Sequence, residues 1–301
     1  MDGPHLICEG PAVGEGPVWC APRDGHDDGE GTVVFTGVAA GVVSRVWPTT
    51  GRVEQIADTA GGPNGAVAAV DGGFVVTQNG GLDFNAFGMS GLPAPRSITS
   101  GLQHVTADGA VSYLTSGATQ QPNDLCVAAD GTIYFTDPPG FPVPVPPAGR
   151  VLALELDGTL RVVADGFSYS NGIALEADGE TLIVVEVGGA IGAEVGFVRL
   201  HPDGSREPFA PGRPGDGFAL DVDGRIYMAG GGPMVCVYEP DGTLVGQLDL
   251  DPPAVTATNC CFGGPDFRTL FVTDLGAPCH VVAFTDMPTP GLAMHPWPGP
   301  R

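Results

Sequence analysis

The sequence contains no lysine, so all twelve of its basic residues are arginines, against 35 aspartates and glutamates and a formal net charge of −23. Without lysine the chain has no P-loop lysine, no Schiff-base amine and no serine–lysine nucleophile pair. A surface this acidic repels phosphate groups, so we expect neither nucleic acid nor an anionic membrane as a partner.

The chain also lacks features of secreted and membrane proteins. Its start, MDGPHLICEG, has no basic region followed by a long apolar run, and no segment approaches the roughly 20 apolar residues of a membrane span. Seven cysteines are present, an odd number, and none forms a C-x-x-C pair. These observations predict a soluble, cytoplasmic protein with reduced thiols.

Several catalytic motifs are missing as well. The sequence has no G-x-S-x-G, no H-E-x-x-H and no G-x-G-x-x-G at the start of a strand-to-helix unit. Its six histidines show no metal-ligand spacing. These absences exclude several common hydrolase and dinucleotide-binding designs.

What the sequence does contain is a repeated hairpin. Short runs rich in Val, Ile, Phe and Tyr flank Asp-Gly and related turns, which is typical of β-hairpins. Five of these runs open on a polar residue seven positions before the turn aspartate, and a sixth, with a longer acidic loop, opens on a glutamate. The six openings are Glu15, Asn64, Asn123, Asn171, Asp216 and Asn259.

The spacing of the openings predicts an all-β fold. They are separated by 49, 59, 48, 45 and 43 residues, close to the length of a four-stranded propeller blade. We expect one six-bladed β-propeller domain over residues 1–301, with antiparallel blades and a lid-like insertion within residues 80–120. Because open sheet edges invite aggregation, the last blade should close by pairing residues 279–286 with the N-terminal residues 5–10.

First strands of propeller blades line the central channel, so the six polar openings should form a ring there. Buried polar side chains cost about 1–3 kcal/mol each when left without partners. Water and turn capping are one way to satisfy them. The other is a hard divalent cation bound only by oxygens, for which Ca²⁺ is the best match and Mg²⁺, Mn²⁺ and Zn²⁺ are alternatives.

Five segments of the repeat follow one another in the order GEGPVW, PNDLCVAADGTIYFTDP, SNGIALEADGETLIVVE, DGFALDVDGRIY and TNCCFGGPDFRTLFVTD. With these segments in this order, the sequence resembles the SMP-30/gluconolactonase/luciferin-regenerating-enzyme family of six-bladed propellers. The resemblance covers nearly the whole chain. It implies one divalent metal ion in the channel, held by Glu15, Asn123, Asn171 and Asp216. It leaves Asn64 and Asn259 beside the ion or in structural roles.

The sequence departs from the family in ways that bear on the substrate. Where the animal sugar-lactone branch has a basic residue, two positions before the Asn of PND, this chain has Gln121. The long segment at 80–105 should lie over the channel mouth, with Arg96, His104 and Phe84 shaping a pocket. The expected substrate-binding residues are therefore Gln121, Arg96, His104, Phe84 and Asn64.

The function that the resemblance implies is hydrolysis of a lactone, a cyclic ester. The ion would polarise the carbonyl while Asp216 takes a proton from the attacking water, and Asp124 assists or orients the water. Alternatives are a phosphotriesterase-like hydrolase, a biosynthetic enzyme acting on a hydrophobic substrate, and a binding propeller whose metal is structural. The expected partner is a small-molecule substrate, and the expected assembly is a monomer or weak homodimer.

Overall fold

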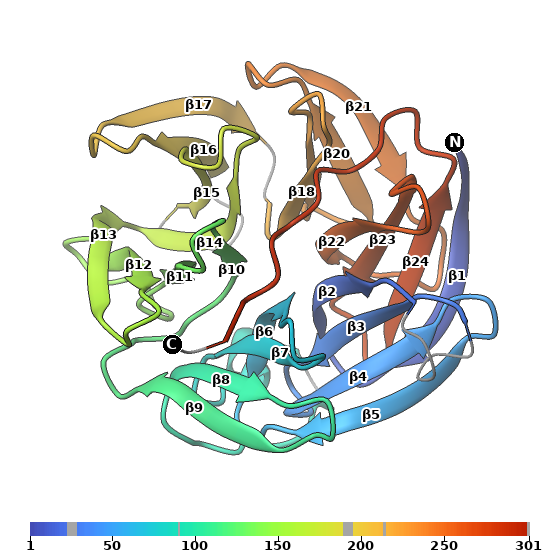
Figure 1. Cartoon of the computed structure of the whole chain (residues 1–301), viewed down its shortest axis with the longest axis horizontal. Helices are drawn as coiled ribbons and strands as arrows, with labels where there is room; N and C mark the ends of the chain where they lie inside the picture. The colour runs from blue at the N-terminus through green and yellow to red at the C-terminus, as the bar shows by residue number, and fades with distance from the viewer. Residues whose placement is uncertain (23–28, 90, 189–194, 213–214, 300–301) are drawn as a thin grey trace.

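The computed structural model describes residues 1–22, 29–89, 91–188, 195–212 and 215–299. The strands form six four-stranded antiparallel sheets arranged around a central channel (Figure 1). This confirms the all-β, six-bladed propeller that the hairpin repeat predicts. Within the described residues, no helix is both long and apolar enough to span a membrane.

The first three blades follow the chain in order, and in each the first strand lies innermost. Their strands are β2 (Gly14–Cys20), β3 (Thr32–Gly37), β4 (Val42–Trp47) and β5 (Arg52–Asp58); β6 (Pro63–Ala68), β7 (Phe74–Gln78), β8 (Gly101–Val105) and β9 (Val111–Ser116); and β10 (Leu125–Val127), β11 (Ile133–Asp137), β12 (Gly149–Leu154) and β13 (Leu160–Phe167).

The remaining blades follow the same plan, except that the last takes its outer strand from the N-terminus. Their strands are β14 (Tyr169–Leu175), β15 (Leu182–Val187), β16 (Val195–Leu200) and β17 (Arg206–Gly212); β18 (Phe218–Leu220), β19 (Ile226–Ala229), β20 (Met234–Tyr238) and β21 (Leu244–Asp249); and β22 (Ala257–Gly263), β23 (Thr269–Asp274), β24 (Cys279–Thr285) and β1 (Asp2–Gly10).

Inner and outer strands differ in how much of their surface is buried. Strands such as β3 and β7 are buried along their whole length, because each sheet packs between two neighbouring blades. The outer strand β5 is exposed over most of its residues. One apolar cluster, which includes Phe35, Phe271 and Val281, packs the last blade against the first. Apolar packing between blades therefore surrounds the channel on all sides.

The two ends of the channel differ. First strands begin at what we call the upper end, and the Asp-Gly turns lie at the lower end. The segment between β7 and β8 belongs to the upper end and contains a short 3₁₀ helix, η1 (Phe84–Phe87). The C-terminal segment crosses the lower end in the view of Figure 1.

The chain ends form the expected clasp. Strand β1 pairs with β24 in antiparallel register, with Cys8 opposite Val281 and Gly10 opposite Cys279. Cys8 is buried in the cluster that joins the last blade to the first, while Leu6 is 50% exposed. All seven cysteines are free thiols. The N-terminal strand thus supplies both an edge and part of the core.

Deleting residues 1–10 should lower the melting temperature by roughly 10 °C, because it uncovers the edge of β24 and opens an inter-blade cluster, at a cost on the order of 3–5 kcal/mol. Cys8→Asp should also lower the melting temperature, because it disrupts the inter-blade cluster while leaving β24 covered. Leu6→Asp, on the exposed face of the same strand, is the matched control and should change it little. A melting temperature unaffected by the deletion would contradict this closure.

Candidate active site in the channel

The predicted ring forms at the upper end of the channel. Glu15, Asn64, Asn123, Asn171 and Asn259 are all at least nine-tenths buried there. Asp216, which precedes β18, is partly exposed. The structure therefore places the polar openings of six blades around one axis, as the repeat implies.

Close contact between blades holds the ring together. The Gly65 amide donates to the Asn123 carbonyl of the next blade at 2.8 Å. A Cβ atom on Gly65 would lie 2.4 Å from Asp124 Oδ1, and one on Gly217 would lie 2.1 Å from Asn259 Cγ. Glycine after the ring residue is therefore required at these positions, because any side chain would push the neighbouring blade away.

The amide groups of the ring are oriented by hydrogen bonds. The side chain of Asn171 donates to Asp216, and the side chain of Asn123 donates to Tyr169. Asn171 Oδ1 and Asn64 Oδ1 are buried and accept no hydrogen bond within the described part of the chain. A buried oxygen without a donor is costly, so these two atoms are suited to a cation or a hydrogen-bond donor from a bound molecule.

Asn259 is different because both its amide nitrogen and its amide oxygen form hydrogen bonds within the protein. Its Nδ2 donates to Glu15 Oε2 at 3.1 Å and to Asp124 Oδ2 at 3.0 Å, and its Oδ1 accepts from the Cys260 amide at 2.8 Å. Asn259 therefore ties Glu15 to Asp124. Its amide oxygen is not available as a ligand.

The carboxylates of the ring are strongly perturbed. Burial raises the pKa of Glu15, and the nearby charges of Asp216 and Asp124 raise it further. Burial likewise raises the pKa of Asp216 and of Asp124. Three acidic groups in one buried site favour a bound cation, which would relieve both desolvation and mutual repulsion.

The donor set fits a hard cation. Among the described residues, no three His, Cys, Asp or Glu side chains form a metal-binding group by themselves. An ion here would depend on amide oxygens as well as on Glu15 and Asp216. Asn171 Oδ1, which accepts no hydrogen bond within the described part of the chain, is an oxygen of this type. Carboxylate and amide oxygens are the ligands that Ca²⁺ and Mg²⁺ prefer.

Tyr169 is a site residue that the sequence reasoning missed. Its phenol is buried, accepts from Asn123, and stacks on Phe141 with ring centroids 4.6 Å apart. Burial raises the pKa of this phenol, and the charges of Asp216 and Glu15 add to the shift, so it stays a neutral hydroxyl. The sequence feature that could have indicated this role is a tyrosine two residues before a ring asparagine. The same feature is equally typical of ordinary packing within a strand.

The other expected substrate-binding residues are not members of the ring itself. Arg96 pairs with Asp58 at 2.8 Å and donates to the Ala40 and Gly41 carbonyls, so it fastens the β7–β8 segment to the first blade. Phe84 opens η1 and is half-buried. Gln121 packs beside Gly140, and its buried Oε1 accepts no hydrogen bond within the described part.

His104 lies in a strand and not in a loop over the channel mouth, where we expected it. It belongs to strand β8, near the lower end, where Nε2 is 3.0 Å from Asp71 Oδ2 and the ring meets Trp297 edge-on at 5.3 Å. The long spacing before the third opening suggested a loop reaching residue 105, but strand pairing resumes at Gly101. Two interactions with the lower face therefore hold this histidine.

Comparison with known proteins agrees with this architecture. A family model described as the SMP-30/gluconolactonase/LRE-like region matches residues 13–276. The chain is 28% identical over 272 residues to a pentonolactonase from Haloferax volcanii, covering 88% of this chain and 82% of that one.

Two solved structures show the same fold. The structure of a gluconolactonase from Xanthomonas campestris is 27% identical, with a TM-score of 0.71 over 93% of this chain and 88% of that one. Regucalcin from Agrobacterium tumefaciens, described as a calcium-binding protein, has a TM-score of 0.75 at 17% identity, over 98% and 97% of the two chains. Since the family model spans most of the chain, the protein belongs to the SMP-30/gluconolactonase/LRE-like family.

Proposed function

We propose that this protein is a divalent-metal-dependent hydrolase that opens lactones. The observation that carries the proposal is the ring itself, in which Glu15 and Asp216 lie beside buried amide oxygens that accept no hydrogen bond from the described residues. Support comes from the relatives named as a pentonolactonase and a gluconolactonase, at 28% and 27% identity.

Glu15, Asn123, Asn171 and Asp216 would hold the ion, and Ca²⁺ suits their oxygens best. When bound, the ion supplies a Lewis acid for the lactone carbonyl. Asn64 Oδ1 and Gln121 Oε1 are buried acceptors without a donor among the described residues, so they are suited to accept hydrogen bonds from substrate hydroxyl groups. A hydroxylated lactone would therefore satisfy atoms that are otherwise costly to bury.

The reaction needs a base, a donor and a fixed geometry. The oxygen of a water molecule attacks the carbonyl carbon, and Asp216, the most accessible carboxylate of the ring, takes the proton. The neutral Tyr169 hydroxyl, which accepts from Asn123, keeps its own proton free to donate to developing negative charge on the substrate. The lactone C–O bond then breaks, and Asp216 returns the proton to the leaving oxygen, which gives a hydroxy acid.

Asp124 has a positioning role in this scheme. Its Oδ2 accepts from Asn259 Nδ2, which also donates to Glu15, so Asp124 fixes Glu15 through Asn259. The β7–β8 segment, fastened by Arg96, would cover the upper mouth as a lid. We further propose that residues 1–301 act as a single domain around this site.

The direct test is proton release from a panel of sugar-derived and aliphatic lactones, using protein stripped with a chelator and then supplied with Ca²⁺, Mg²⁺, Mn²⁺ or Zn²⁺. Turnover should appear only with added metal and should be fastest with hydroxylated lactones. Folded protein that hydrolyses no lactone with any of these ions would overturn the proposal.

Asp216→Asn should reduce kcat by about 100-fold or more, because the amide takes no proton from water. The melting temperature should stay within a few degrees of the parent value, since the substitution removes one of three neighbouring acidic groups that repel one another. Asp157→Asn, on an exposed turn, is the control and should leave kcat unchanged. Wild-type turnover by Asp216→Asn would remove this residue from catalysis.

Tyr169→Phe removes the hydroxyl but keeps the stacking on Phe141, so the fold should be preserved. We expect kcat to fall about 10-fold or more with little change in KM, because the donor acts on charge that develops in the transition state. Tyr113→Phe, at a 40% exposed tyrosine, serves as the control. An equal fall for both variants, or for neither, would exclude the proposed role.

A further inference from the structure

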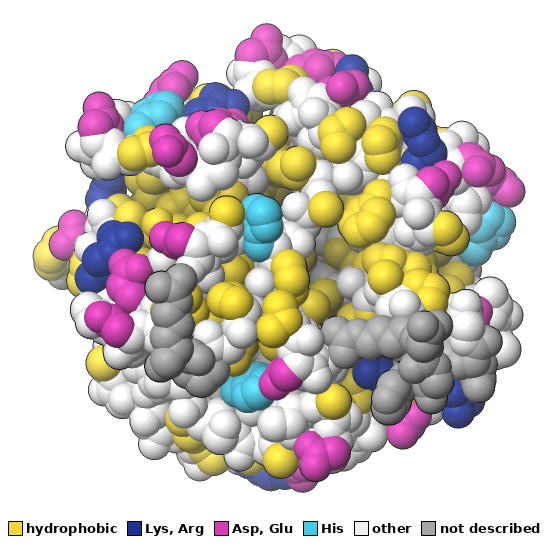
Figure 2. Space-filling view, viewed as in Figure 1, with side chains coloured by type: hydrophobic (Ala, Val, Ile, Leu, Met, Phe, Trp, Pro, Cys, Tyr) yellow, Lys and Arg dark blue, Asp and Glu magenta, His cyan; other side chains and the backbone are white. Residues whose placement is uncertain are grey.

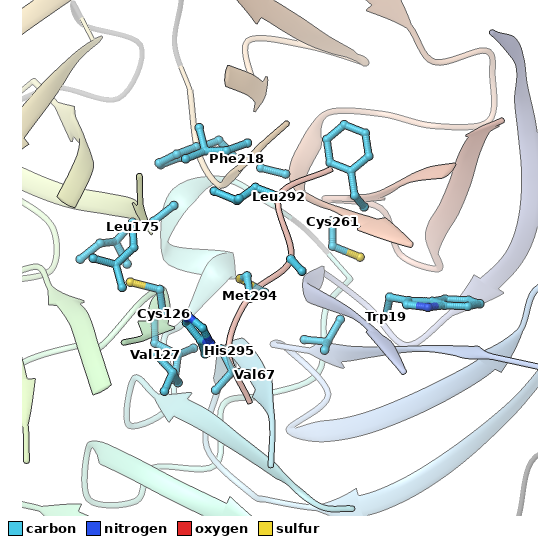
Figure 3. Close-up of a pocket in the computed structure, with 18 of the residues that line it drawn as sticks. Trp19, Val67, Cys126, Val127, Leu175, Phe218, Cys261, Leu292, Met294 and His295 are labelled. Carbon is cyan, nitrogen blue, oxygen red and sulfur yellow. The ribbon is translucent and has the colours of Figure 1, made fainter. Parts of the chain in front are cut away.

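Below the ring, the lower half of the channel encloses a cavity of about 210 Å³, which we call the lower chamber. Its walls are the first strands of the blades, and they present Val67, Val127, Leu175, Phe218 and Cys261 (Figure 3). Hydrophobic side chains also gather around the middle of this face of the molecule (Figure 2). The chamber is thus largely apolar, unlike the ring above it.

The C-terminal segment closes the lower chamber as a strap. The Leu292 amide donates to the Leu220 carbonyl on one side of the channel, and the Trp297 amide donates to the Ala68 carbonyl on the other, both at 2.8 Å. Residues 293–296 between these anchors are exposed and cross the opening, with Met294 and His295 over the chamber (Figure 3). The strap is therefore anchored on both sides of the channel.

The polar groups of the chamber restrict what it can hold. Asp124 and Asn259 form its inner end, and their mutual hydrogen bond, extended to Glu15, separates it from the upper site. Neither lysine nor arginine occurs among the described residues that line it. Glu176 at the rim already pairs with Arg199 at 2.8 Å. His295, on the strap, is the one described lining residue that can become cationic. While this imidazole is neutral, an anion would meet like charge without compensation, whereas a neutral molecule would not.

We infer that the lower chamber is a second binding site, distinct from the ring, for a compact neutral molecule with an apolar body and one hydroxyl group. The hydroxyl points toward Asp124, the only carboxylate at the inner end among the described lining residues. An apolar cavity of about 150 Å³ accommodates benzene, so this one suits a body of about six to ten carbon atoms. The inference does not depend on lactone hydrolysis.

The test uses the full chain and the ε-methyl group of Met294 as an NMR reporter on the strap. Cyclohexanol is the probe, and hexanoate is an anion of the same carbon number. Cyclohexanol should shift the Met294 signal saturably, and hexanoate should bind at least about 10-fold more weakly. Absence of a saturable shift up to the solubility of cyclohexanol, or equal binding of hexanoate, would overturn the proposal.

Filling the chamber gives an independent readout. Ala174 and Ala219 line it and are partly exposed there, so Ala174→Leu and Ala219→Leu should each weaken cyclohexanol binding about 10-fold or more. Ala110→Leu, on the exposed turn between β8 and β9, should leave binding unchanged. Wild-type affinity in a folded, filled variant would place the probe elsewhere. If both filled variants fail to fold, the comparison of cyclohexanol with hexanoate on the parent protein still decides the question.

Discussion

The site depends on one hydrogen bond that recurs between neighbouring blades. It joins a threonine at the upper end of one blade's second strand to the ring residue of the next blade. Thr36 Oγ1 donates to the Asn64 carbonyl at 2.7 Å, and Thr136 Oγ1 donates to the Asn171 carbonyl at 2.6 Å. Thr77 makes the same contact with Asn123. Together with glycine after most of the ring residues, these bonds set how closely the blades approach, and hence how closely their polar side chains converge.

The charge of the protein makes this convergence costly. Glu15, Asp124 and Asp216 meet in a chain of net charge −23 that has no lysine to offset them. Hydrogen bonds from the side-chain amides of Asn259 and Asn171 to these carboxylates reduce the electrostatic cost. Because the amide nitrogen faces the carboxylate, the amide oxygen faces away from it. In the ring, Asn171 Oδ1 is thereby left without a donor among the described residues. The arrangement of amides and carboxylates is thus complementary to a cation rather than to an anion or an apolar group.

The sequence predicts the fold and the ring well because both arise from a repeat. Seven residues separate each opening from its turn, and that spacing places Asn64, Asn123 and their equivalents at the same height in every blade. Features outside the repeat are harder to predict. The roles of Tyr169 and Asn259 depend on hydrogen bonds between blades, and sequence spacing carries no information about these.

Loops and the C-terminal segment were the least predictable parts. Arg96 lies in the expected segment but is bound to Asp58, a residue 38 positions earlier. His104 was assigned to a loop, whereas local strand pairing places it in β8. The C-terminal segment lies outside the hairpin repeat. It is a strap anchored at Leu292 and Trp297, because backbone carbonyls at the lower ends of β18 and β6 accept hydrogen bonds from it.

The most direct test of the central claim, that the channel ring is a cation site, is anomalous diffraction from crystals equilibrated with Mn²⁺ after chelator treatment. The account predicts one strong anomalous peak within the ring, with Glu15, Asn123, Asn171 and Asp216 as ligands, and its loss in an Asn171→Ala variant that keeps the fold. A ring filled only by water at saturating Mn²⁺, or a peak confined to surface carboxylates, would contradict it.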